Sequence, residues 1–152
     1  MSAAFKRDKY IILLQYIMIP SKYIGPLSRK DKKIQRNMIL RSRRLYAKGQ
    51  YFTRKPLASY KNKTSKHILK AERIYGVKIA PTKELAAKTG CSVSALKAVV
   101  RKGQGAYYSS GSRPNQTAQS WGLARLASAI TGGKAAKVDY HIIKECHKLA
   151  KK

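Results

Sequence analysis

Apolar residues recur every three or four positions along most of the chain, which is the spacing that places them on one face of an α-helix. The first such stripe is Ile34, Met38 and Leu45, and it predicts a helix that begins at Ser28 and ends at Gly49. Similar stripes predict further helices over residues 65–75, 82–89, 92–102, 121–131 and 135–149. The chain is therefore expected to form a small, mainly α domain.

Between two of these helices, residues 103–117 are small, polar and rich in glycine. Glycine permits positive φ and close approach of the backbone, while Ser, Asn and Thr bond to nearby backbone groups. We expect an ordered loop here, since a flexible linker has little use for paired tyrosines and an Arg-Pro step. The residues expected to shape this loop and the adjoining core are Gly103, Gly105, Tyr107, Tyr108, Arg113, Pro114, Trp121, Gly132 and Gly133.

Residues 82–102 have the pattern of a helix-turn-helix hairpin. Thr82 is placed to cap a short helix, Gly90 to form the turn, and Ser92 to cap a second helix with Leu96 and Val99 inward. In a DNA reader the exposed start of the second helix meets the base edges. That start offers Ser92, Ser94, Ala95 and Lys97, a set that is poor in base readers because it holds no Arg, Asn or Gln for bidentate contacts. Any hairpin of two helices produces the same pattern. The sequence therefore predicts the helix-turn-helix shape, but it does not predict recognition of specific DNA bases.

The N-terminal run Tyr10–Ile19 is apolar, but it is too short for its period to distinguish a strand from a helix. Basic residues precede it as in a signal peptide, yet Pro20 and lysines follow where a small-residue cleavage site is needed. We interpret the run as a buried element or as an arm inserted into a neighbour. The expected organisation is an extended apolar arm over residues 1–26 and one basic helical domain over residues 27–152, with no segment long enough to span a bilayer.

Charge changes this picture, because the chain has 34 Lys+Arg against 6 Asp+Glu and a formal net charge of +28. Such an excess opposes compaction unless a polyanion neutralises it, and the usual polyanion is nucleic acid. An acidic protein or an anionic membrane surface is an alternative. The cations predicted to contact phosphate are Arg36, Arg43, Arg44, Arg54, Lys55, Lys97, Arg101 and Lys102.

Aromatic and cationic residues interleave over residues 51–63, around Pro56. Such interleaving occurs where aromatic rings stack on exposed bases. It also occurs where rings anchor an extended segment to a core, and for Tyr51, Phe52 and Tyr60 we favour this second interpretation.

The residues needed for catalysis are sparse. The six acids are scattered, no Gly-x-Ser-x-Gly or complete phosphate-binding loop occurs, and the cluster of His141, Cys146 and His147 lacks a fourth ligand. We therefore expect no enzyme activity, no metal, no cofactor and no small-molecule substrate. Two cysteines are too few for a disulfide framework, so Cys91 and Cys146 are expected to be small core residues in a reducing compartment.

One long stretch resembles the signature of a small basic domain of large double-stranded DNA viruses, including those of algae and amoebae. The stretch is residues 103–142, GQGAYYSSGSRPNQTAQSWGLARLASAITGGKAAKVDYHI. The resemblance extends from about Ile19-Pro20 to the C-terminus. It takes in LSRKDKKIQ (27–35), YFTRKP (51–56) and KTGCSVSALKAVVRKGQGAYYSSGSRP (88–114). It implies a setting in the virus particle or the infected cell, and it supplies no catalytic residues.

Two functions follow from charge and resemblance together. The first is a non-enzymatic structural virion protein, a minor capsid component on the inner face of the shell, whose partners are other capsid proteins and double-stranded DNA bound without sequence preference. The alternative is a helix-turn-helix-like protein that binds or condenses DNA in the host cytoplasm or nucleus during infection. An inner-shell protein contacts phosphates only, whereas a regulator prefers one site.

Overall fold

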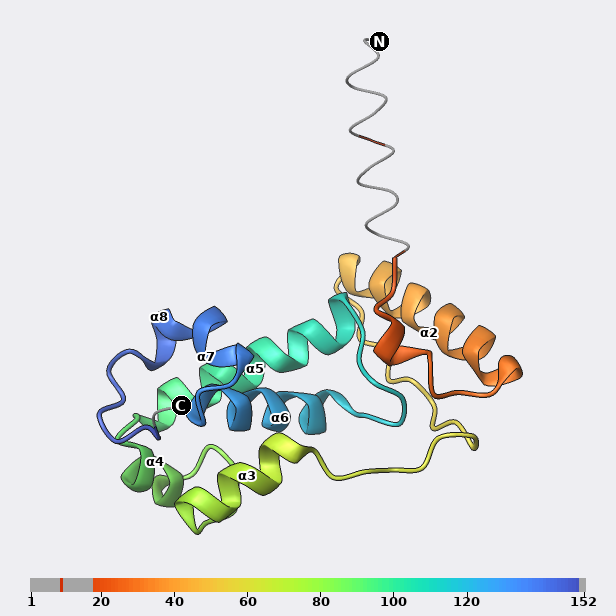
Figure 1. Ribbon diagram of the computed structural model, residues 1–152. Helices are drawn as coiled ribbons and strands as arrows, with labels where there is room; N and C mark the ends of the chain where they lie inside the picture. The colour runs from red at the N-terminus through yellow and green to blue at the C-terminus, as the bar shows by residue number, and fades with distance from the viewer. Residues whose placement is uncertain (1–8, 10–17, 151–152) are drawn as a thin grey trace.

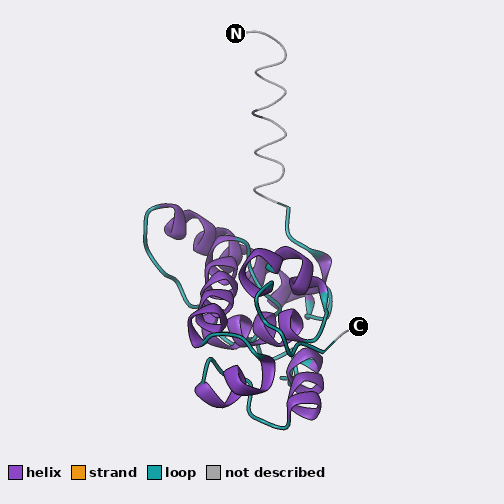
Figure 2. Cartoon of the chain, turned by 90° about the vertical axis from the view of Figure 1, so that its left-hand side faces the viewer, coloured by secondary structure: helices purple, strands orange, loops and turns teal. Residues whose placement is uncertain are grey.

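The computed structural model describes residue 9 and residues 18–150, and within them every regular element is helical. The predicted mainly α class is therefore confirmed (Figures 1 and 2). The elements are η1 (Ser21–Tyr23), α2 (Arg29–Ala47), α3 (Lys66–Tyr75), α4 (Lys83–Thr89), α5 (Val93–Ser109), α6 (Ala118–Ile130), α7 (Lys134–Val138) and α8 (Tyr140–Ile143).

Helix ends follow local sequence signals. The side chains of Ser28, Thr82 and Ser92 each accept a hydrogen bond from the backbone N–H three residues later, at the starts of α2, α4 and α5. Gly76 and Gly90 close α3 and α4 in the left-handed conformation, with φ of 69° and 70°. The predicted hairpin of α4, turn and α5 is confirmed, and Leu85, Leu96 and Val99 are fully buried inside it.

At the start of α2, Ser28 and Asp31 have the spacing of a capping box, but only Ser28 makes the expected contact. Asp31 does not bond back to Ser28; its carboxylate accepts hydrogen bonds from the backbone N–H and the hydroxyl of Ser59. Ser59 Oγ in turn accepts from the backbone N–H of Ser28, at 3.1 Å. The bonds from Ser59 lower the pKa of Asp31 from its ordinary value. Asp31 thus fastens the 52–60 segment to α2.

Helix α5 runs from the group of α3, α4, α6 and α8 to α2 (Figure 1). Its first half belongs to the larger core, which α3, α4, α6 and α8 complete around Leu96, Val99 and Leu126. Its last turns pack on α2, which carries two smaller clusters, one around Ile39 and the other around Met38. Because one continuous helix enters both regions, the positions of α2 and of the main core are coupled.

Residues 103–109 are not the predicted loop, since α5 continues through them to Ser109. The physical reason is the crossing of α5 and α6: a Cβ on Gly103 would lie 2.6 Å from Gly122 Cα. A Cβ on Gly122 would lie 2.7 Å from the carbonyl oxygen of Val100. Both glycines are therefore needed for close helix packing, and neither serves a turn.

The actual loop is residues 110–117, and its anchor is Asn115. This residue has a positive φ of 61°, and its side chain bonds the backbone N–H and C=O of Leu57, the C=O of Tyr60 and the side chain of Asn62. Pro114 is buried beside it and Arg113 is exposed. The loop therefore holds the extended 57–62 segment in place by hydrogen bonds.

The predicted C-terminal helix over residues 135–149 is wrong. The chain forms two short helices, α7 and α8, and leaves helical structure after Ile143. Asp139 lies at the junction and turns its side chain fully into the interior. The turn before α7 is as expected: Gly132 has a φ of 72°, and a Cβ on Gly133 would collide with Ser128 Oγ.

The prediction of two free cysteines is also wrong, because Cys91 and Cys146 form a disulfide. The bond joins the start of α5 to the segment after α8, across 55 residues of sequence. Two hydrogen bonds hold the same segment: Lys148 N donates to Thr89 O at 3.0 Å, and Ala150 N donates to the Tyr75 hydroxyl at 2.9 Å. Sequence spacing alone could not show that these distant cysteines meet.

The predicted N-terminal arm lies mostly outside the described residues. Its last part is packed: Ile19, Tyr23 and Ile24 form an apolar cluster with Ile39 of α2. Trp121 joins the same cluster, with its ring edge-on to Tyr23 at a centroid distance of 5.9 Å. Trp121 is only partly buried, so it anchors this cluster at its rim and does not occupy the centre of the main core.

Candidate nucleic-acid interface

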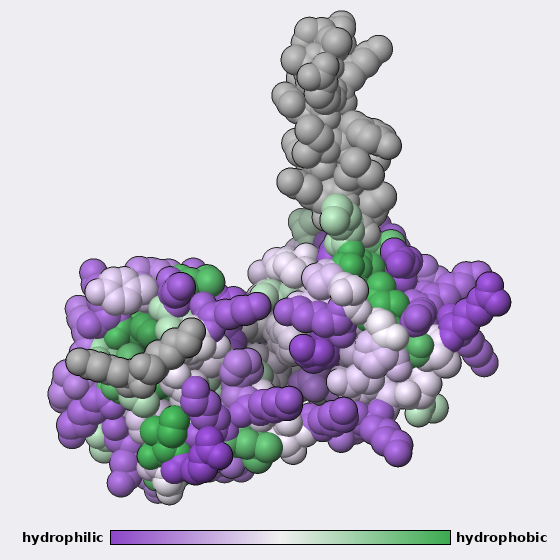
Figure 3. Space-filling model, in the orientation of Figure 1, coloured by the Kyte–Doolittle hydropathy of each residue, from purple (hydrophilic) through white to green (hydrophobic). Residues whose placement is uncertain are grey.

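The outer side of α2 is rich in cations. Gln35, Met38, Ile39 and Ser42 are buried on the inner side of the helix. The exposed cations of α2 and its C-cap are Arg29, Lys30, Lys32, Lys33, Arg36, Arg41, Arg44 and Lys48. We call this set the α2 cationic face; many hydrophilic residues, with some apolar ones among them, lie at this right-hand end of the molecule in Figure 3. The one acid in the helix, Asp31, is occupied by Ser59.

Six of the cations predicted to contact phosphate are exposed, on three different elements. Arg36 and Arg44 lie on the α2 cationic face, Lys55 lies in the segment after it, and Lys97, Arg101 and Lys102 lie on α5. Between residues 18 and 150 the one ion pair is Arg125–Asp139, so these side chains carry charge that no carboxylate in that range neutralises. The remaining two predicted contacts have a different role.

Arg54 is buried, which corrects the prediction that it faces phosphate. Its guanidinium donates to Tyr107 O at 2.9 Å, to Ser112 Oγ at 2.8 Å and to Ser42 Oγ at 3.2 Å, and it lies 3.8 Å from the centre of the Tyr107 ring. All of these partners are neutral, and burial lowers the pKa of Arg54. Arg54 therefore ties α2, the end of α5 and the 110–112 turn together.

Arg43 is the second correction, because only 8% of it is exposed. Its Nε donates to Ser110 O at 2.8 Å and its Nη2 donates to Met18 O at 3.1 Å. These bonds join α2 to the end of α5 and to the start of the described chain. The sequence did not show that Arg43 is buried, because Arg43 and Arg44 are adjacent and chemically identical. They differ only in which side of α2 packs against the rest of the chain.

Three tyrosines form an open hollow between α2 and α5, which the sequence did not predict. Tyr108 stacks on Tyr46 at a centroid distance of 6.1 Å and an interplanar angle of 11°, and Tyr51 lies 5.1 Å from Tyr108. Tyr51 is 72% exposed, so it is not the core anchor that was favoured. The hollow has a volume of about 330 Å³, and Arg101, Gln104, Gly105 and Ala118 complete its lining. We refer to it as the tyrosine hollow.

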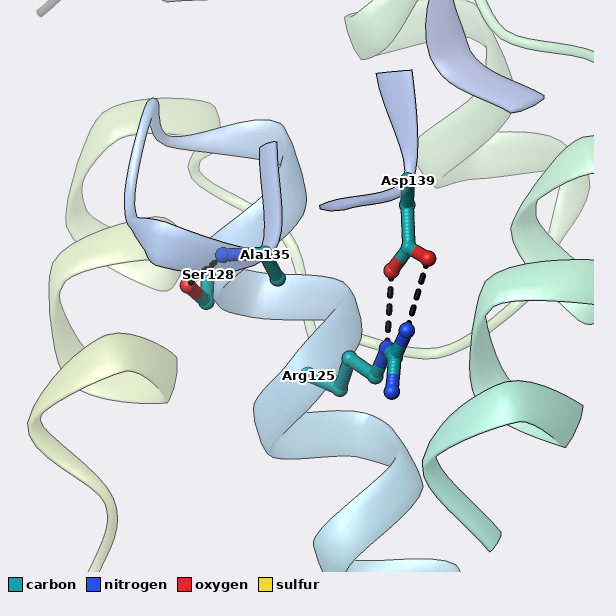
Figure 4. Close-up of polar contacts among 4 residues, drawn as sticks. All are labelled: Arg125, Ser128, Ala135 and Asp139. Atoms are coloured by element: carbon teal, nitrogen blue, oxygen red, sulfur yellow. Dashed lines mark hydrogen bonds and ion pairs between the residues drawn. The ribbon is translucent and has the colours of Figure 1, made fainter. Parts of the chain in front are cut away.

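Arg125 and Asp139 form a bidentate pair that fixes the C-terminal helices (Figure 4). Nε and Nη2 of Arg125 lie 2.8 Å from the two carboxylate oxygens of Asp139, which is completely buried. The hydrogen bond to Asp139 raises the pKa of Arg125. Nearby, Ala135 N donates to Ser128 Oγ at 3.2 Å. Because both interactions connect α6 to α7 and its end, we assign them a structural role.

The helix-turn-helix hairpin exposes Ser92, Ser94 and Lys97 at the start of α5, as expected, whereas Ala95 is half-buried. The C-terminal segment packs against its turn: a Cβ on Gly90 would lie 2.8 Å from the His147 ring, and Lys148 Nζ lies 3.5 Å from Ala87 O. The hairpin surface is therefore partly covered by residues of the same chain.

Within residues 18–150 no three His, Cys, Asp or Glu side chains are grouped as metal ligands would be. Among the helices that the structure describes, none has the length and apolarity needed to cross a bilayer.

Comparison with known proteins assigns the chain to a family. Residues 20–145 match the family of unknown function DUF5824. The chain belongs to DUF5824. The match begins at Pro20 and so covers η1, the α2 cationic face, the tyrosine hollow and the hairpin. No curated protein and no solved structure matches the chain. The DUF5824 assignment therefore leaves the function to be argued from the chain itself.

Proposed function

We propose that this protein is a non-enzymatic structural component of a large double-stranded DNA virus particle. In this proposal it lies on the inner side of the shell as a minor capsid protein, with its cationic surface toward packaged DNA or acidic capsid neighbours. The observation that carries the proposal is the α2 cationic face, a helix side with many cations whose one acid is already bonded. The viral setting rests on the sequence resemblance.

Duplex DNA suits the α2 cationic face on physical grounds. Each cation that neutralises a phosphate releases condensed counterions, and this term does not depend on sequence. Lys and Arg contacts to phosphate position a protein on DNA without reading bases. The exposed cations of α2 lack the buried hydrogen-bond partners that hold Arg43 and Arg54, so they keep the freedom to follow a DNA backbone.

Reversing charge on the α2 cationic face should weaken duplex binding for every sequence. We expect the double variant Arg36→Glu and Arg44→Glu to lower affinity and to flatten the slope of log K against log salt by about 2, since each lost phosphate contact removes about 0.9. The measurement is fluorescence anisotropy on two unrelated duplexes over a range of salt. Arg43 must stay unchanged, because it holds the fold.

The matched control is Lys70→Glu with Arg73→Glu, which places the same charge change on the exposed side of α3. If only the net charge of the protein matters, both variants should lose the same affinity for duplex DNA. If the α2 cationic face binds the DNA, the α2 variant should lose clearly more affinity than the α3 variant. Equal losses, or an unchanged slope in the α2 variant, would contradict the proposal that α2 meets phosphate.

Fractionation of purified particles tests the virion role. Particles are opened gently, shell and DNA core are separated, and the protein is quantified in each fraction by mass spectrometry. We expect it in the shell fraction at a fixed ratio to the main capsid protein. Absence from particles would contradict the structural role and leave the second candidate.

The second candidate is a DNA-binding or genome-condensing protein of the infected cell that uses the α4–α5 hairpin. Its support is the helix-turn-helix geometry and the exposure of Lys97 on α5. The partial cover by the C-terminal segment and the lack of bidentate base-reading side chains favour the first proposal. A regulator would hold one duplex far more tightly than the other in the same anisotropy measurement.

A further inference from the structure

We propose that the tyrosine hollow binds an unpaired nucleotide of a nucleic acid, with the base against the tyrosine rings and its phosphate at Arg101. This inference rests on the proposed function in that the α2 cationic face supplies the attraction for nucleic acid. It adds a second contact, specific for single-stranded regions, which no phosphate contact explains.

The ring arrangement suits a flat aromatic ligand. Tyr46 and Tyr108 are nearly parallel, and Tyr51 is tilted against them by 49° and 46°. Tyr51 is 72% exposed, so its ring is open to solvent and accessible to a ligand. Bases stack on exposed tyrosines without regard to sequence, because every base has a π-face. The volume of about 330 Å³ lies at the small end of ligand sites, as expected for one nucleotide.

The polar lining suits a phosphate beside that base. Arg101 lines the hollow and makes no ion pair within residues 18–150. Ala118, the first residue of the 13-residue helix α6, also lines it, so the positive end of that helix dipole lies at the same place. Gln104, whose amide bonds the side chain of Gln119 at 2.7 Å, supplies groups that can exchange to a base edge.

The positive charge around the tyrosine hollow favours a nucleotide over the other ligands that bind to aromatic sites. A cage of tyrosines also attracts methylated ammonium groups by cation–π interaction, but such a cage has no cation in its wall. Arg101 and the surrounding net charge of +28 repel a cationic ligand. An acidic peptide is attracted by the charge, yet its carboxylates gain nothing from the three tyrosine rings. A nucleotide uses both features.

The test compares single-stranded and duplex DNA. We expect Tyr51→Ala to lower affinity for a thymidine oligonucleotide by about 5- to 100-fold, the effect of losing one stacked base, and to change duplex affinity far less. The salt slope should not change, because stacking releases no counterions. Tyr51→Phe keeps the ring and should restore most of the affinity. Anisotropy at fixed salt, with circular dichroism as a check of folding, measures each variant.

The matched control is Tyr140→Ala, which removes another exposed tyrosine, 64% accessible and outside the hollow, and should leave both affinities unchanged. Gly105→Leu fills the hollow with a helix-compatible side chain, since a Cβ there lies at an ordinary 3.5 Å from Tyr46 Oη. This variant should lose single-strand affinity as Tyr51→Ala does and keep its thermal stability.

The outcomes separate this inference from the α2 proposal. The nucleotide site is overturned if Tyr51→Ala lowers the affinity for single-stranded and duplex DNA equally, or lowers neither. It is also overturned if the variant weakens the binding of polyglutamate as much as that of single-stranded DNA. If Tyr51→Ala acts on single strands alone while the α2 charge reversal leaves duplex affinity unchanged, the hollow stands and the α2 proposal fails.

Discussion

Reducing the Cys91–Cys146 disulfide should lower the free energy of unfolding by about 4 kcal/mol. The bond closes a loop of 55 residues, and in the chain-entropy treatment a loop of this length restricts the unfolded chain by about that amount. A loss of this size is a large part of a domain's usual stability. Urea unfolding followed by circular dichroism, with and without a thiol reductant, measures it.

The matched control is the double variant Cys91→Ala and Cys146→Ala. It should unfold at the lower urea concentration of the reduced protein and should not respond to reductant. A wild-type midpoint that reductant leaves unchanged would show that the two cysteines are not bonded in solution. A protein that depends on this bond requires oxidation to reach full stability.

Arg125→Met should destabilise the protein by about 3–5 kcal/mol, because it leaves the fully buried carboxylate of Asp139 without its partner. Methionine keeps the unbranched apolar stem of the side chain and removes the guanidinium, so the loss reflects charge and hydrogen bonding more than packing of the stem. Asp139 lies between α7 and α8, and its orientation sets how both helices return to α6. Thermal or urea unfolding of the single variant measures the effect.

The double variant Arg125→Met with Asp139→Asn provides the control, because it removes both charges and leaves a neutral side chain of the same shape. We expect it to recover part of the lost stability. If the double variant is less stable than Arg125→Met alone, the buried charge is not the cause of the loss, and the packing of α7 is.

Local signals accounted for the helical hairpin and for most helix boundaries. Thr82, Gly90 and Ser92 act within a few residues of their own positions, so their roles follow from side-chain length and backbone conformation alone. The same holds for Ser28 at the start of α2 and for Gly76 at the end of α3. In these places the sequence and the structure agree because no distant contact competes.

Contacts between distant residues explain the errors. Gly103 suggested a loop, yet its neighbour across the helix crossing is Gly122, and the pair permits packing that no local pattern reveals. Arg54 suggested a phosphate contact, yet its hydrogen bonds reach residues more than 50 positions away. A buried arginine and an exposed one differ only in what packs over them.

The candidate sites also depend partly on local sequence and partly on contacts between distant residues. The sequence by itself determined the mainly α class, the helix-turn-helix hairpin, the excess of positive charge and the positions of Arg36 and Arg44 on a helix, because composition and helical period are properties of the chain alone. Only the tertiary structure decided which cations remain exposed, that Cys91 meets Cys146, and that Tyr46, Tyr51 and Tyr108 converge beside Arg101. Those facts depend on which surfaces of α2, α5 and α6 face one another, and packing sets that across distances that no short sequence pattern spans.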